Sequence, residues 1–330
     1  MMAEDSPVDF SGTPNKWQAP GVYSCVPPVA RTFRFLTQTD MQLKTDDSFN
    51  RRSVILMLGS VVLFAANTLL IRAIALHTPA ADGWVAILFR GGVGLLFVFV
   101  LFGFGRGLDM KRLFSGRLIT IRGIIGALST IAFYITIIKL GAGRAVIINL
   151  TYPIFASVIA AVWLKEKISR GAFVWMLVGF GGLVVFLSEA GQLLRPSPYD
   201  LLALAGAVGS GWVVVIIRRL RHEEHPATIY ASQAFYGMLI AAPAAVKVPA
   251  LPTSAWLGLA VGAVIVTIAQ LIMTQAYQFM SVSRGSSLQM LLPIVTAVGG
   301  FFLFGEAFHP LEIAGAMLTL FATWRVVVSH

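Results

Sequence analysis

Two apolar stretches of this chain carry the same set of polar and helix-breaking residues at the same spacing. The first set is Arg144, Asn149, Pro153 and Glu166. The second set, 140 positions later at every member, is Arg284, Gln289, Pro293 and Glu306. Cations, amides, prolines and carboxylates in this arrangement can bind a solute and bend a helix, but they supply neither an activated nucleophile nor a metal-ligand cluster. The repeat therefore predicts a binding and gating site enclosed between two copies of one element.

The two prolines are expected to interrupt their helices. A proline lacks the backbone N–H and crowds the carbonyl four residues earlier, and that carbonyl belongs to Asn149 in the first copy and to Gln289 in the second. An amide side chain at this point can satisfy the loosened backbone or face a wet cavity. A kink needed only for packing is the alternative. The matched amides favour a kinked helix that lines a path.

The charged members of the two sets have the sign that the helix dipole disfavours at each end. Arg144 and Arg284 begin their helices, where an arginine either extends to lipid headgroups or meets an anionic solute or a gating carboxylate. Glu166 and Glu306 end the same helices. Glu166 stands between two lysines, which predicts an ion pair within the loop. Glu306 has no basic neighbour in the sequence and could pair across the interface of the repeats.

Arg90 is the deepest charge in any apolar stretch. It lies about eight residues into its span, about 12 Å along a helix, and a charge at that depth is costly and marks a functional residue by default. A structural salt bridge is the alternative. Arg72 and Arg122 lie closer to the ends of their spans and are expected at the membrane interface. The predicted substrate-binding residues are Asn67, Arg90, Tyr134, Asn149, Tyr152, Gln270, Thr274 and Gln289.

The composition places most of these elements in a membrane. Hydrophobic residues make up 57% of the chain and charged residues 12%, which is about half the charged share of a soluble domain. Apolar runs of about 20 residues, the length that crosses a bilayer as a helix, recur along the chain. The ten predicted spans are residues 54–76, 83–103, 118–138, 144–164, 171–188, 200–217, 227–246, 255–276, 285–304 and 311–328. The predicted fold class is an all-α polytopic membrane protein with ten transmembrane helices.

Residues 1–50 differ from the rest of the chain. They are polar, contain five prolines and lack the apolar core of a signal peptide, which predicts a disordered cytoplasmic tail. Met41 offers an alternative start shortly before the first span. The single cysteine, Cys25, excludes an intrachain disulfide.

The basic residues that flank the spans predict a multi-pass protein of the plasma (inner) membrane with both termini in the cytoplasm. With the N-terminus inside, fourteen of them lie on the inner side and four on the outer side. The inner set is Arg51, Arg52, Arg106, Lys111, Arg112, Arg117, Lys165, Lys167, Arg170, Arg218, Arg219, Arg221, Arg284 and Arg325. The outer set is Lys139, Arg144, Arg195 and Lys247. Because the basic residues lie in short loops, the net charge of +10 does not indicate a nucleic-acid partner.

Ten spans divide into five and five, and an odd number turns the second copy over in the membrane. An inverted 5+5 repeat of this kind allows two states related by symmetry, one open to each side. The expected domains are 51–190 for the first repeat and 191–330 for the second. In span 2, the segment 90–94 shows a weaker alignment with the segment 233–237 in span 7.

Several function classes lack their signatures in this sequence. No phosphate-binding G-x-x-x-x-G-K-[ST] motif occurs, which argues against an ATP-driven pump. The histidines lie at loops or span ends, and the carboxylates lie near span ends. Their positions argue against the usual metal site and most proton relays. They also argue against a cation/proton antiporter, which needs a carboxylate at the centre of a span. No metal and no cofactor are expected.

The inverted repeat, with proline-containing spans that end in residues 164–166 (Leu-Lys-Glu) and 304–306 (Phe-Gly-Glu), resembles the drug/metabolite transporter superfamily, and the two halves look like its EamA domains. The resemblance covers about residues 53–328. It implies export or import of small metabolites such as amino acids through a central cavity lined by spans 1, 3, 4, 6, 8 and 9. The small multidrug-resistance branch carries a glutamate in span 1, where this chain has Asn67. Coupled export of cationic drugs is therefore not expected.

These observations predict a secondary transporter of a small organic metabolite that works by alternating access. Arginines without buried acidic partners favour a neutral, zwitterionic or anionic solute. A membrane-embedded enzyme acting on a lipid or isoprenoid substrate is the alternative, and it would need buried carboxylates, histidines or a nucleophile. A channel would show a fixed filter or a charged ring. The expected partners are the substrate and the lipid bilayer, and a homodimer is left open.

Overall fold

The computed structural model describes residues 51–78, 83–103, 105–140, 142–187, 197–243, 251–305 and 309–328, and each regular element within these ranges is helical. The first half contains α2 (Arg51–His77), α3 (Gly83–Phe102), α4 (Arg112–Ser115), α5 (Arg117–Leu140), α6 (Ala142–Asn149), α7 (Tyr152–Ile159), the π-helix η3 (Ala160–Leu164) and α8 (Arg170–Leu187). The second half contains α9 (Pro198–Leu220), α10 (Pro226–Ala241), α11 (Thr253–Ala276), α12 (Val282–Gln289), α13 (Leu292–Phe304) and α14 (Pro310–Val328). The predicted tail, residues 1–50, lies outside the described residues.

The apolar spans of the sequence correspond to these helices, which confirms the all-helical fold. Among the described residues, six helical segments are long and apolar enough to cross a membrane: α2, α5, α9, α11, the α12–α13 pair and α14. Three further apolar segments, within α3, α7–η3 and α8, are shorter. Large apolar side chains such as Val162, Leu201 and Phe302 are exposed. Outward apolar faces of this kind suit helices that contact lipid, because a helix satisfies its backbone hydrogen bonds internally.

Both proline-containing spans are interrupted at the same place. In the first repeat α6 ends at Asn149 and α7 begins at Tyr152; in the second, α12 ends at Gln289 and α13 begins at Leu292. In the second break both residues make i→i−3 hydrogen bonds, from the N–H of Met290 to Ser287 and from that of Leu291 to Leu288. In the first break the N–H of Thr151 donates to Ile148 in the same way, whereas that of Leu150 keeps an i→i−4 bond to Val146. Each proline then occupies the first turn of the following helix, where its missing N–H costs nothing. The predicted kink is therefore a complete break between two helices.

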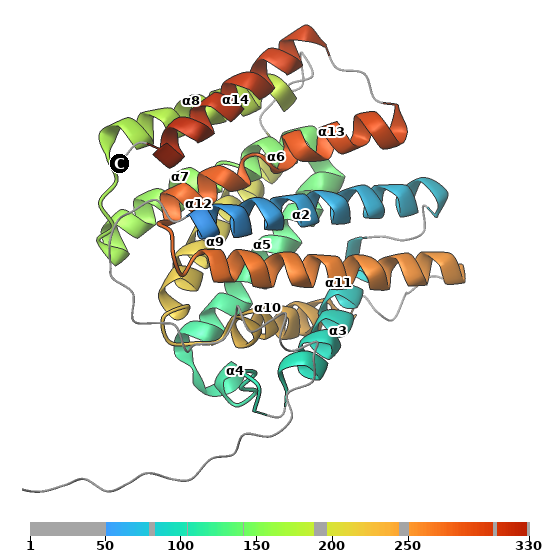
Figure 1. The fold of residues 1–330 in the computed structure, drawn as a ribbon. Coiled ribbons are helices and arrows are strands. Elements are labelled where there is room, and N and C mark those ends of the chain that lie inside the picture. Colours follow the sequence, from blue (N-terminus) through green and yellow to red (C-terminus); the bar gives the residue numbers. More distant parts are fainter. Residues whose placement is uncertain are drawn as a thin grey trace, which may run out of the picture. The chain divides into compact units, whose positions relative to one another are not determined.

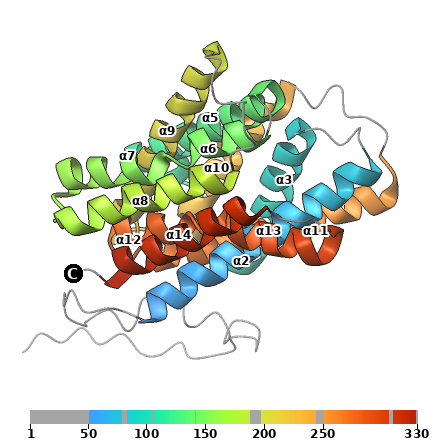
Figure 2. The ribbon, with the colours of Figure 1, turned by 90° about the horizontal axis from the view of Figure 1, so that it is seen from above.

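The helix pairs that pack together repeat between the two halves. Helix α11 of the second half packs against α2 of the first half, and correspondingly α5 of the first half packs against α9 of the second. In the same way, α13 packs against α2 and α7 packs against α9. Two pairs join an element to its own counterpart, namely α8 with α14 and α3 with α10. Figures 1 and 2 both show α8 and α14 lying side by side. These self-paired crossings mark the axis that relates the two repeats.

Small residues permit the close approach of α8 and α14. A Cβ on Gly182 would lie only 2.8 Å from the hydroxyl of Thr319 and 2.9 Å from the carbonyl oxygen of Gly315. A Cβ on Gly315 would meet the backbone of α8 at 2.6 Å. A glycine is therefore required on each helix at this crossing.

Candidate functional site

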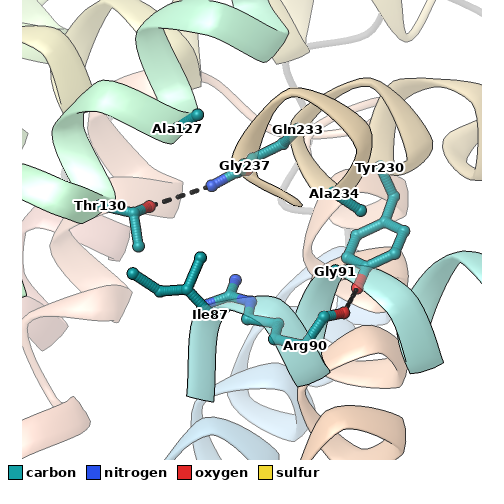
Figure 3. Close-up of a pocket in the computed structure, with 9 residues that line it drawn as sticks. All are labelled: Ile87, Arg90, Gly91, Ala127, Thr130, Tyr230, Gln233, Ala234 and Gly237. Atoms are coloured by element: carbon teal, nitrogen blue, oxygen red, sulfur yellow. Dashed lines mark hydrogen bonds between the residues drawn. The ribbon is translucent and has the colours of Figure 1, made fainter. Parts of the chain in front are cut away.

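A small cavity lies between α3, α5 and α10. Its volume is about 30 Å³, enough for ordered water but not for an organic solute. Its lining residues are Ile87, Arg90, Gly91, Ala127, Thr130, Tyr230, Gln233, Ala234 and Gly237. Figure 3 shows the guanidinium of Arg90 pointing into the cavity, with Thr130 and Gln233 on the opposite side. The predicted substrate-binding arginine thus lines a small cavity between three helices, with apolar walls and a few polar groups.

Hydrogen bonds hold the polar walls of this cavity in place. The Gln233 amide donates to the hydroxyl of Thr130 at 3.2 Å and to the carbonyl of Gly126 at 3.4 Å, which links α10 to α5. The Tyr230 hydroxyl donates to the backbone carbonyl of Arg90 at 3.4 Å and lies 2.8 Å from the Thr267 hydroxyl of α11. Hydrogen bonds therefore join α10, one wall of the cavity, to α3, α5 and α11.

The cavity lies at the crossing of α3 with its counterpart α10. The alignment of segment 90–94 with segment 233–237 pairs Arg90 with Gln233 and Gly91 with Ala234, and all four residues line the cavity. A Cβ on Gly91 would lie 3.0 Å from the carbonyl oxygen of Ala234, so these two counterparts are in close contact. The cavity is therefore lined by residues of both repeats, with a cation from α3 and a neutral amide from α10.

Arg122 departs from the expectation that it lies at the membrane interface. It is 0% exposed, and none of its three guanidinium nitrogens has a hydrogen-bond partner. The charged or ionisable groups that act on it are Arg90 and Tyr230. Two features cover the end of α5 that would otherwise reach solvent: α4 packs over it through the buried side chain of Leu113, and the Tyr236 hydroxyl donates to the Leu113 carbonyl. The prediction of an interfacial Arg122 is therefore wrong: α5 packs against α4 and α10, and Arg122 is buried within the bundle. By contrast, Arg72 is exposed, as expected of an interfacial arginine.

The two amides of the repeated set have different environments. The Gln289 amide donates to the Met57 sulfur at 3.1 Å and to the Ser60 hydroxyl at 3.3 Å, both in α2. The Oδ1 atom of Asn149 is buried and has no hydrogen-bond partner. One amide is therefore anchored to a neighbouring helix, while the oxygen of the other is unsatisfied beside the helix break.

The remaining predicted binding residues are spread over several helices. Tyr134 packs with Ile87, a cavity residue, in a small apolar cluster. Gln270 and Thr274 are buried in α11, and the Thr274 hydroxyl has no hydrogen-bond partner. Tyr152 is partly buried against the main hydrophobic core. The structure therefore places Tyr134 beside the cavity and does not bring these three other residues to its lining.

Asn67 of α2 faces α11 rather than the cavity lining. A Cβ on Gly262 would lie 3.0 Å from the Asn67 side-chain oxygen, so α11 passes close to this amide. Asn67 is partly buried. It belongs to the interface of α2 with α11.

Glu166 forms a latch that joins three helices at one end of the bundle. Its Oε1 accepts a hydrogen bond from Nε of Arg218 in α9 at 3.3 Å, and its Oε2 accepts from the N–H of Val282, the first residue of α12, at 3.0 Å. Arg218 also donates to the carbonyls of Tyr277 and Gln278 at 2.7 and 2.6 Å. The predicted ion pair with the flanking lysines is wrong: both lysines are exposed, and the partner is Arg218, 52 residues away.

The counterpart end carries a different residue at the position of the latch cation. The position that corresponds to Arg218 at the spacing of 140 is Thr78, which has no charge. Glu306, the counterpart of Glu166, lies outside the described residues, and so does the side chain of Arg144. Arg284 is partly buried in α12. The Glu166–Arg218 pair therefore has no residue-for-residue equivalent at this spacing.

The loop between α9 and α10 lies at the same end. Arg221 donates to the Gln275 side chain at 2.6 Å and to the Glu224 carbonyl at 2.9 Å, and burial lowers the pKa of Arg221 to about 10. Burial raises the pKa of the Glu224 carboxyl, although Arg112 at 3.4 Å opposes that shift. Burial, with the charge of Arg221, lowers the pKa of His225 to about 4. The ring of His225 is therefore neutral at pH 7, and its Nδ1 accepts from the N–H of Ala227 to cap α10.

Sequence reasoning missed three polar residues of the cavity as binding candidates. Tyr230 and Gln233 belong to α10, a span whose repeat signal is weak, and Thr130 was only one of many hydroxyls on span 3. The alignment of Gln233 with Arg90 was the available signal. It would have identified Gln233, because a residue matched to the deepest cation must lie at a similar depth.

These features define a helical membrane protein made of two related halves around a polar crossing. The EamA-like transporter family matches residues 51–188 and 197–328, and the chain belongs to that family. It is therefore a membrane transporter and not an enzyme. The pseudopaline exporter CntI of Pseudomonas aeruginosa, from strains UCBPP-PA14 and PAO1, is 26% identical over 285 residues, which cover 82% of this chain and 94% of the exporter. A solved crystal structure with 17% sequence identity covers 83% of this chain and 95% of its own, with a TM-score of 0.70, which shows a shared fold.

Proposed function

We propose that this protein is a secondary transporter that moves a small organic metabolite by alternating access around the α3–α10 crossing. Its ten spans form an inverted 5+5 repeat with both termini in the cytoplasm. The observation that carries the proposal is the cavity at the α3–α10 crossing, which is lined by Arg90 of one repeat and Gln233 of the other. In transporters built from inverted repeats, the solute binds near the midplane at the interface of the repeats.

The hydrogen bonds at the latch end support the proposed topology. The α3–α5 connection meets α10 through the N–H of Asp109 and the hydroxyl of Thr228 at 3.0 Å. The α9–α10 loop meets the α3–α5 connection through Glu224 and Arg112. The end of η3, the end of α9 and the start of α12 meet at Glu166. Every second connection between spans therefore lies at this end. This is the arrangement expected when successive helices cross the membrane in opposite directions. The fourteen flanking basic residues support a cytoplasmic position for this end.

The latch gives the alternating-access cycle a closed cytoplasmic end. In this structure, α12 packs against both α7 and α9, and Glu166 bridges the same elements. The helix breaks at 150–151 and 290–291 let the half-helices on either side move separately. Release of the latch is the step that opens the carrier to the cytoplasm, and the symmetry of the repeats makes closure of the other end the matching step.

The solute is neutral, zwitterionic or anionic, since the cavity presents an arginine and neutral hydrogen-bonding groups. The similarity to an exporter of pseudopaline favours movement out of the cell. The amides Asn149 and Gln289, at the two helix breaks, are proposed to line the path when the cavity enlarges.

Transport by the purified full chain in proteoliposomes tests this function. A panel of radiolabelled amino acids, organic acids and neutral metabolites is offered to liposomes with and without the protein. We expect saturable, protein-dependent uptake of one class, with loss of affinity or turnover in Arg90→Gln. Arg117→Gln, an exposed arginine on α5, is the matched control and should behave as wild type. Uptake of panel members at the protein-free rate by correctly folded protein would contradict the proposal.

A further inference from the structure

Arg122 is a cation that the fold buries without an internal acceptor. Its side chain is 0% exposed, and its Nε and both terminal nitrogens lack hydrogen-bond partners. A guanidinium carries five N–H donors in a planar fork, and burial of an uncompensated charge is among the costliest arrangements in a protein interior. Within a membrane span such a residue marks a functional site by default. No residue in the described part of the chain supplies an acceptor for it, and a bound solute can.

A second cation lies within electrostatic reach of Arg122. The charge of Arg90 acts on it, and the Tyr230 phenol lies within range of both guanidinium groups. Figure 3 shows Arg90 extended into the cavity, beside Tyr230. No carboxylate is among the groups that act on Arg122. The partly buried carboxylates Glu166 and Glu224 pair with Arg218 and Arg112 instead. The described part of the chain therefore places two cations together and leaves them without an anion.

We propose that Arg90 and Arg122 form a dicationic subsite for a carboxylate-bearing solute of net negative charge. The proposal rests on the transport function proposed above and adds to it one residue, Arg122, and one charge class. Two guanidinium groups match a carboxylate in geometry and charge, because each can donate two parallel N–H bonds to its oxygens. A solute with two carboxylates neutralises both cations, whereas a neutral or cationic solute leaves them uncompensated.

The rest of the cavity suits the uncharged part of such a solute. Thr130 and Gln233 offer a hydroxyl and an amide, and Ile87 and Ala127 offer an apolar wall. The cavity of about 30 Å³ is too small for the solute in this state. Binding therefore accompanies the separation of α3 from α5 and α10, which also brings Arg122 into contact with the cavity.

Thermal unfolding of the purified full chain in detergent tests the subsite without a transport measurement. The probes are succinate, citrate, the neutral isostere succinamide and inorganic phosphate, all at matched ionic strength. We expect succinate or citrate to raise the midpoint temperature by at least about 3 °C, because a ligand that binds only the folded state stabilises it. Succinamide should have no effect. Arg90→Gln and Arg122→Gln should abolish the shift, Arg122→Lys should weaken it, and Arg117→Gln should retain it.

The unliganded variants provide a second readout. An unpartnered buried cation destabilises the folded state, so Arg122→Gln should unfold at the wild-type temperature or above it. A fall of several degrees, or failure to fold, would show that Arg122 serves a structural ion pair and would overturn the proposal. A rise in midpoint temperature with succinate or citrate that survives in Arg122→Gln would also overturn the proposal. So would a rise with phosphate alone. Uptake of a neutral solute by proteoliposomes, with no rise in midpoint temperature with succinate or citrate in detergent, would refute the subsite while upholding the transport function.

Discussion

The Thr319 hydroxyl donates a hydrogen bond of 3.2 Å to the carbonyl oxygen of Gly179, a residue that stands 140 positions earlier and occupies the same place in the first repeat. The neighbouring contacts are reciprocal. A Cβ on Gly179 would meet Ala322 at 3.3 Å, and Gly182, which is 140 positions before Ala322, approaches Thr319 in return. A residue can contact its own counterpart only on the axis that relates the two copies. The α8–α14 crossing therefore fixes one point of the pseudo-twofold axis.

Gly182→Ala should separate α8 from α14. The added methyl group would lie 2.8–2.9 Å from the Thr319 hydroxyl and two backbone atoms of α14, which cannot all move aside, so we expect a loss of about 1–3 kcal/mol in the free energy of unfolding. Gly181→Ala is the matched control, because nothing lies within 4 Å of its added carbon. It should be neutral or stabilising by up to about 1 kcal/mol. Thermal unfolding in detergent measures both, and equal effects would refute the close crossing.

Lys165→Gly should stabilise the protein by about 1 kcal/mol. Lys165 ends η3 with a φ of 54°, in the left-handed region, and it is the non-glycine residue with positive φ in the described part of the chain. Its counterpart Gly305 adopts nearly the same conformation, with a φ of 67°. A left-handed residue with a side chain costs about 1–2 kcal/mol, partly offset by the greater freedom of glycine in the unfolded chain. Lys167→Gly, at an exposed residue, should not stabilise. A stability gain in both variants would assign the effect to charge.

Glu166→Gln should release the latch and expose the start of α12. The neutral amide keeps the shape of the side chain but loses the charge that attracts Arg218 and strengthens the bond from the N–H of Val282. In a Cys25→Ser background, a cysteine at Ser283, which is buried in α12, reports opening through its rate of labelling by a hydrophilic maleimide. We expect a several-fold faster rate in Glu166→Gln.

The control for the latch is Glu223→Gln. Glu223 pairs with Arg219 at 2.8 Å on the exposed surface of the same end, and a surface pair of this kind contributes little. Its loss should leave the labelling rate unchanged. Equal labelling in Glu166→Gln and wild type would show that the carboxylate is not what holds this end closed.

Acid should destabilise the protein through His225. The unfolded histidine takes up a proton below about pH 6.5, whereas the folded ring stays neutral until about pH 4. The unfolded state therefore binds more protons between these values, and the free energy of unfolding should fall as pH drops from 6.5 towards 4, by about 3 kcal/mol at most. His225→Asn keeps the helix cap and should flatten this slope. The exposed His309→Asn should not. Stability that is independent of pH in wild type would refute the burial of a neutral ring.

The two repeated amides should differ when each is replaced by alanine. Gln289→Ala removes two contacts to α2 and should lower both stability and transport. Asn149→Ala removes a buried oxygen without a hydrogen-bond partner, so it should lower transport but leave stability unchanged or raised. Proteoliposome uptake and thermal unfolding separate the two effects. Wild-type kinetics in both variants would remove the amides from the transport path.

Apolar length and proline position were enough to predict the helices and the two breaks, because both depend on the local backbone and its burial in lipid. The partners of individual charges were not predictable. Glu166 has lysines beside it, yet it pairs with a residue 52 positions away, since the loop geometry turns those lysines outward. The burial of Arg122 depends on how α5 packs against its neighbours, α4 and α10 among them, which the position of Arg122 near the end of its span does not reveal. Tyr230 was missed because nothing in the sequence of α10 reveals which of its faces meets α3, whereas Gln233 was signalled only by its weak alignment with Arg90.

Contact between a residue and its own counterpart also bears on the history of the chain. Two separate copies of a single repeat, assembled in opposite orientations, would place identical side chains face to face on the axis. An arginine on the axis would then confront a second arginine, and the two charges would repel each other. A single polypeptide is free of that constraint, because one half can carry Arg90 where the other contributes Gln233 to the same cavity. Two identical halves would hold a solute in two equivalent poses, whereas two different halves can distinguish one end of a solute from the other.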